Sequence, residues 1–188
     1  MSSPADTLAV ENVVALTSIG QELDLETLAD DLPTADYAPD HFPGLVYRTE
    51  SPQGTTLIFR SGKVVCTGAQ SVIAVEDALE MFFQELRELG IHVDDDPDIT
   101  IENLVTSGDL DERLNLNAIA IGLGLANIEY EPEQFPGLVY RLDEPAVVVL
   151  LFGSGKLVIT GARTVEDAEA ALDTVQSQLE NLDLIEGV

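Results

Sequence analysis

Few residues of this chain have the types and spacing that catalysis or metal binding requires. The segment FGSGKL (152–157) resembles a phosphate-binding loop, but that motif needs glycine at the position of Leu150 and Ser or Thr at the position of Leu157. The single cysteine, Cys66, and two distant histidines do not make a common zinc site. No spacing suggests a nucleophile beside its base, so we expect no enzyme, no cofactor and no metal. An enzyme with a carboxylate site is the weakest alternative.

The ionisable side chains are mostly carboxylates, with 35 Asp and Glu against 8 Lys and Arg and a formal net charge of −27. Such an excess repels nucleic acid and anionic membranes in ordinary buffer. The chain is nevertheless 45% hydrophobic, which suffices for a folded core. An acid-covered, lysine-poor surface is typical of a highly saline cytoplasm, since at 1 M salt the screening length is only about 3 Å. An acidic protein that avoids nucleic acid is the alternative interpretation.

Sequence features that direct a chain to a membrane or out of the cell are not found. No run of about 18 apolar residues occurs, and the first residues lack the basic-then-apolar pattern of a signal peptide. A single cysteine fits a reducing compartment. We therefore expect a cytoplasmic protein.

Five of the eight cations lie in two similar stretches, FPGLVYRTESPQGTTLIFRSGKVVCTGA (42–69) and FPGLVYRLDEPAVVVLLFGSGKLVITGA (135–162). At a constant offset of 93, 17 of the 28 positions are identical, which indicates a tandem duplication. These stretches carry three acids, whereas the other 132 residues carry 32 acids and three cations. Because Asp and Glu are concentrated outside the repeated stretches, these stretches are candidates for a recognition surface.

The elements that must position these residues have the same order in each copy. The pattern predicts a β-branched strand, a short helix (23–32 in the first copy), several antiparallel strands, and a long helix that ends before Gly90. The seam near residues 93–100 divides the chain into repeats 1–95 and 96–188. A pseudo-twofold pair is the natural architecture, because two copies are too few for a solenoid.

The predicted strands are apolar on both faces, as in VVVLLF (147–152). The long helices can cover one face, whereas a broad uncovered apolar face on a folded domain marks a binding site. A two-sheet sandwich, in which both faces belong to the core, is the alternative that periodicity leaves open.

Both repeats and their spacing resemble the TATA-box-binding protein family of archaea and eukaryotes, from about Val10 to Ile185. The resemblance implies an α+β fold, a pseudo-twofold saddle in which a curved antiparallel sheet of about ten strands has four helices on its convex side. It also implies that the concave face binds and bends the minor groove of a TATA box.

The resemblance further assigns residues to roles. The intercalating wedges are Phe42, Phe59, Phe135 and Phe152. Minor-groove contacts, polar and apolar, are Asn12, Asn103, Thr67, Thr160, Val14, Leu57, Val65, Val105, Val148, Leu150 and Val158. Phosphate contacts are Arg48, Arg141, Lys63, Lys156, Ser61 and Ser154.

The implied partners are double-stranded TATA-box DNA, transcription factor B and, indirectly, RNA polymerase. Glu131 and Glu133 fall where the family docks transcription factor B. We therefore expect a general transcription initiation factor that acts on nucleoid DNA in a high-salt cytoplasm, and a homodimer without DNA is a further possibility. The alternative function is a duplicated interaction domain that binds a protein or small ligand on the same apolar face. The chain departs from relatives that carry a cation after TGA, because Gln70 stands there in the first copy.

Overall fold

The computed structural model describes residues 4–186, and the chain divides into two compact units. The N-terminal half runs from Asn12 to Glu102, and the C-terminal half comprises the segment up to Glu11 together with the chain from Asn103 onward. Strands β1 (Ala9–Ser18) and β6 (Thr100–Asp109) each contribute residues to both units. These units are defined by packing, so the repeats 1–95 and 96–188 stay a prediction from sequence similarity.

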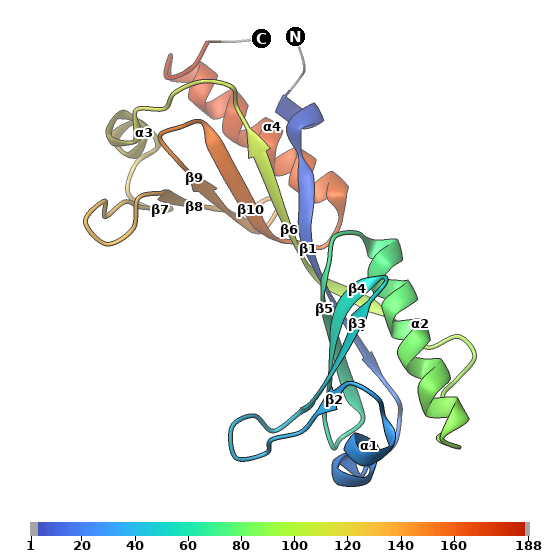
Figure 1. Cartoon of the computed structure of the whole chain (residues 1–188). Helices are drawn as coiled ribbons and strands as arrows, with labels where there is room; N and C mark the ends of the chain where they lie inside the picture. Colours follow the sequence, from blue (N-terminus) through green and yellow to red (C-terminus); the bar gives the residue numbers. More distant parts are fainter. Residues whose placement is uncertain (1–3, 187–188) are drawn as a thin grey trace. The chain divides into compact units, whose positions relative to one another are not determined.

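In the N-terminal half the hydrogen-bonded strand order is β2-β3-β4-β5-β1. The long helix α2 (Val72–Glu88) packs across β4 and β5 (Figure 1). The remaining elements are α1 (Leu25–Asp31), β2 (Ala35–Asp36), β3 (Leu45–Glu50), β4 (Gln53–Ile58) and β5 (Lys63–Ala69).

The C-terminal half repeats this arrangement with the order β6-β10-β9-β8-β7. Its long helix α4 (Val165–Asn181) packs on β10 and on the 3-10 helix η1 (Pro4–Thr7) (Figure 1). The remaining elements are α3 (Leu116–Leu123), β7 (Ile128–Glu129), β8 (Leu138–Leu142), β9 (Val147–Leu151) and β10 (Lys156–Ala162).

The predicted α+β fold, with about ten antiparallel strands and four helices, is confirmed. Over residues 4–186 all the strands belong to a single sheet, so the two-sheet sandwich was the wrong alternative. Apolar side chains on both faces of a strand therefore do not mean that two protein layers cover it.

Burial alternates along the strands with a period of two. In β4, Thr56 and Ile58 are buried, whereas their neighbours Thr55 and Leu57 are half-buried. On the same buried face, the ring of Tyr47 in β3 lies 5.5 Å from that of Phe82, which is fully buried in α2. One face of each half-sheet is therefore core, and the opposite face keeps access to solvent.

Local capping explains where the helices begin and end. Asp24 and Thr164 accept hydrogen bonds from the backbone N–H groups three residues further on, at Thr27 and Asp167. The same Asp24–Thr27 bond lowers the pKa of the Asp24 carboxyl. Gly90 follows α2 with a φ of 81°, as the predicted helix stop requires.

Gly62 lies in the hairpin between β4 and β5, and its substitution tests whether this turn requires glycine. Its φ is 86°, and a Cβ there would overlap the carbonyl oxygen of Gln21. We expect Gly62→Ala to lower the free energy of unfolding by about 2 kcal/mol or more, measured by urea denaturation in molar KCl. Gly20→Ala is the matched control, because Gly20 has a φ of 79° and a Cβ there would meet no other atom within 4 Å. Equal losses for the two variants would contradict a steric role for Gly62.

Candidate nucleic-acid interface

The solvent-accessible side of each half-sheet, opposite its helices, is here called the open face. All seven predicted apolar contact residues lie on it and are half-buried, each flanked by buried neighbours. They are Val14, Leu57 and Val65 in the N-terminal half and Val105, Val148, Leu150 and Val158 in the C-terminal half. The structure thus gathers each predicted set on one side of its own half.

The open face also includes apolar residues that the sequence analysis did not name. Val46 in β3 and Val139 in β8 are half-buried, and Leu16 in β1 is 37% exposed. The period-two alternation could have identified Val46, because it stands two residues before Arg48 on the same strand.

The four predicted wedge phenylalanines form one pair in each half. Phe42 and Phe59 have ring centroids 5.8 Å apart at 65°, and Phe135 and Phe152 have centroids 5.9 Å apart at 69°. Both pairs are edge-to-face, which is a favourable arrangement for aromatic rings. Phe135 is 38% exposed, so its ring can reach a ligand without unfolding the half.

A glycine in each FPGLVYR copy makes room for these rings. A Cβ on Gly44 would lie 2.7 Å from Cε1 of Phe42, and a Cβ on Gly137 would lie 2.7 Å from Cε1 of Phe135. Real Cβ atoms do not come so close to a ring carbon. The glycine of the repeated Phe-Pro-Gly therefore meets a packing requirement of the neighbouring rings.

A polar network occupies the open face of the N-terminal half, between β1 and β5. The side-chain oxygen of Asn12 accepts a hydrogen bond from the backbone N–H of Gly68 at 2.7 Å, and its Nδ2 donates to the hydroxyl of Thr67 at 3.1 Å. Gly68 has a φ of 90°, and the register of β1 against β5 shifts beside it.

The C-terminal half has the same network between β6 and β10. Asn103 accepts from the N–H of Gly161 at 2.6 Å and donates to Thr160 at 3.2 Å. An amide NH₂ has two hydrogens, so after bonding Thr160 it can still donate one to a ligand. Both halves thus present an oriented donor within an apolar surface.

The two predicted arginines lie on the open faces but differ in their partners. Both are exposed, in β3 and β8. Arg141 forms an ion pair with Glu129, with Nη2 and Nε 3.2 and 3.3 Å from Oε1. Across residues 4–186 Arg48 has no carboxylate within ion-pair distance.

The two predicted lysines follow the Ser-Gly turns and are exposed. The hydroxyls of Ser61 and Ser154 accept weak hydrogen bonds, both 3.4 Å long, from the backbone N–H groups of Lys63 and Lys156. Lys156 Nζ lies 3.6 Å from Oδ2 of Asp109. The serines therefore stabilise the turns that carry the lysines.

The acids predicted to bind a protein partner lie in the loop between β7 and β8. Glu131 and Glu133 are both exposed. The carbonyl of Glu131 accepts hydrogen bonds from the N–H groups of Gln134 and Phe135 at 2.9 and 3.0 Å. This turn connects the acidic loop directly to Phe135, one of the predicted wedge residues.

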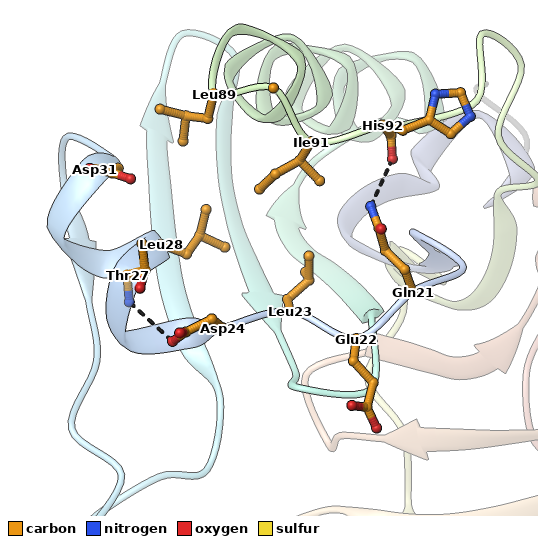
Figure 2. A pocket seen from close by; sticks show the side chains of 11 residues that line it. Gln21, Glu22, Leu23, Asp24, Thr27, Leu28, Asp31, Leu89, Ile91 and His92 are labelled. Carbon is orange, nitrogen blue, oxygen red and sulfur yellow. Dashed lines mark hydrogen bonds between the residues drawn. The ribbon is translucent and has the colours of Figure 1, made fainter.

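A groove of about 510 Å³ in the N-terminal half lies away from the open face. Figure 2 shows Leu28, Leu89 and Ile91 around one hollow, with Asp24 and Asp31 at its edge. None of the predicted contact residues lines this groove. This groove is therefore not part of the candidate interface.

The described residues also give information on metal binding, on the cysteine thiol and on membrane spanning. No group of three His, Cys, Asp or Glu side chains within residues 4–186 is placed to hold a metal ion. Burial raises the pKa of the Cys66 thiol, which is fully buried. None of the helices in this range is long and apolar enough to span a bilayer.

Each half therefore offers an apolar strip, one oriented amide donor, a pair of aromatic rings and cations at the rim. The minor groove of A·T-rich DNA presents acceptors without the guanine amino group. Proteins that bind there insert apolar side chains between base steps. Both sets of side chains match what such a groove requires.

Comparisons with known proteins show which family the chain is similar to. The family model described as transcription factor TFIID, or TATA-binding protein, matches residues 7–89 and 98–182. TATA-box-binding protein 1 of Haloferax volcanii is 67% identical over 187 residues, covering 100% of this chain and 99% of the relative. The TATA-box-binding protein of Natronomonas pharaonis is 63% identical, with 100% of both chains covered. The structure of Methanococcus jannaschii TBP matches with a TM-score of 0.85 and 50% identity, covering 93% of this chain and 99% of that chain.

Proposed function

Because the chain belongs to the TATA-binding protein family, a family of transcription factors, we propose that it binds the TATA box through the minor groove and bends it. The observation that supports this most directly is that each open face carries one edge-to-face pair of phenylalanines. Each pair stands beside an apolar strip that no protein layer covers among residues 4–186.

The polar residues give this binding its base preference. The free amide hydrogens of Asn12 and Asn103, together with the hydroxyls of Thr67 and Thr160, donate to adenine N3 and thymine O2. A guanine amino group in the same place would clash with these donors, so A·T steps are favoured. Arg48, Arg141, Lys63 and Lys156 bind phosphates flanking the groove, with Ser61 and Ser154 assisting.

The second part of the proposed function is the recruitment of transcription factor B and, through it, RNA polymerase. The exposed Glu131 and Glu133 bind transcription factor B, which then brings RNA polymerase to the promoter. The protein acts on nucleoid DNA in a saline cytoplasm, which agrees with its net charge of −27. Association of two copies through their open faces without DNA stays a prediction.

Fluorescence transfer between dyes at the ends of a TATA duplex, in molar KCl, tests the proposal. The wild type is expected to shorten the end-to-end distance of this duplex, but not of a G·C duplex, and added transcription factor B should stabilise the bent complex. Failure to bend any A·T-rich duplex would refute the proposal and favour the duplicated interaction domain.

Asn103 provides a test of the base preference. In Asn103→Asp the carboxylate still accepts from Gly161, but it cannot donate and it adds negative charge to the open face. We expect about a tenfold or greater loss of affinity for the TATA duplex, measured by fluorescence anisotropy. Asn117→Asp, exposed on α3, is the control for the added charge. If both variants lose affinity equally, net charge rather than the amide donor is responsible.

A further inference from the structure

The two halves share a fold but differ in how their rim cations are partnered. In the C-terminal half Arg141 contacts Glu129 at 3.2 Å, and Lys156 lies 3.6 Å from Asp109. The hydroxyl of Thr7 accepts a hydrogen bond from the backbone N–H of Asp109 at 2.9 Å, which helps to fix the backbone of that acid. Both predicted phosphate-binding cations of this half are thus engaged by carboxylates.

The equivalent cations of the N-terminal half are not engaged in this way. Strand register places Lys63 opposite Ser18, where Lys156 has Asp109 opposite. At the offset of 93, Asp36 occupies the position of Glu129, and its side chain is one methylene shorter. Within residues 4–186 no ion pair forms at Arg48 or Lys63.

We propose that Asp109 and Glu129 are intramolecular competitors for DNA phosphate, so that the N-terminal half supplies most of the phosphate binding. This inference rests on the proposed binding of DNA. A cation already neutralised by a carboxylate releases fewer counterions when it meets a phosphate, and the carboxylate itself repels that phosphate. The side chains of Arg141 and Glu129 are 56% and 67% exposed, so phosphate can displace the carboxylate and the pair weakens binding without preventing it.

The first experiment measures the slope of log affinity for a TATA duplex against log KCl concentration. Asp109→Asn with Glu129→Gln should make the slope more negative than that of the wild type, by up to about 0.9 for each cation released. Affinity at the lowest salt that keeps the protein folded should rise several-fold. Asp36→Asn, which removes the same charge as Glu129→Gln from the equivalent position, should leave the slope unchanged.

The reciprocal variants test the same idea from the other half. Ser18→Asp places a carboxylate opposite Lys63 and should make the slope less negative. Arg48→Gln should shift the slope by about 0.9 in the positive direction, whereas Arg141→Gln should shift it much less. In the Glu129→Gln background, however, Arg141→Gln should change the slope as much as Arg48→Gln does.

The outcomes separate this inference from the proposed function. Equal slopes for Arg48→Gln and Arg141→Gln, with normal bending by the wild type, would overturn the competition and leave the proposed function standing. An unchanged slope in the Asp109→Asn and Glu129→Gln double variant would do the same. Absence of any duplex binding by the wild type would refute both the competition and the proposed function.

Discussion

Replacing Phe59 and Phe152 together by alanine is expected to abolish bending of a TATA duplex and to lower affinity roughly a thousandfold. Each ring loses about 2 kcal/mol of apolar burial against the base step, and about 1.4 kcal/mol corresponds to one factor of ten. Kinking also requires a wedge to replace the base stacking that is lost. Fluorescence transfer reports the bend, and anisotropy reports the affinity.

The effect should be specific to the open faces, because each mutated ring packs on its partner Phe rather than in the helix-covered core. Phe59 and Phe152 are half-buried, whereas Phe82 and Phe83 are at most 1% exposed. The double variant should therefore stay folded by circular dichroism. Met81→Ala, which truncates a 41% exposed apolar side chain on α2, is the control and should bend DNA normally. Normal bending by the Phe double variant would show that these rings are not the wedges.

The duplication made much of this fold predictable from sequence. Identical spacing in the two copies required the same strands and helices twice, and the helix signals at Asp24 and Gly90 lie where the structure has a cap and a stop. Periodicity alone could not choose between a sandwich and a single sheet, because Leu57 and Ile58 are equally apolar. Only the placement of α2 over β4 and β5 shows which of these two side chains belongs to the core.

The candidate site was predictable in its residue types but less so in their interactions. The resemblance identified Asn12 and Asn103, yet their bonds to Gly68 and Gly161 depend on a register shift that the sequence does not display. The pairing of Lys156 with Asp109 likewise depends on strand register between residues 47 positions apart. Such contacts between distant segments are set by tertiary structure, so local patterns could not reveal them.

Affinity for the TATA duplex is expected to rise by about tenfold or more as KCl increases from dilute to molar, the reverse of most DNA-binding proteins. A net charge of −27 repels DNA, and the screening length falls from about 10 Å at 0.1 M to about 3 Å at 1 M. Phosphate binding by four predicted cations, two of them already paired, weakens over the same range. Burial of the Phe rings and the apolar strip does not weaken, so it dominates in molar salt.

Two controls separate screening from salt-dependent folding. Circular dichroism identifies the KCl range in which the protein is folded, and only that range is used for binding. Sucrose is excluded from protein surfaces, as are some salts, but it carries no charge, so any rise in affinity that it causes reports exclusion rather than charge screening. A steady loss of affinity across the folded range would mean that phosphate attraction, not the apolar open face, holds the complex together.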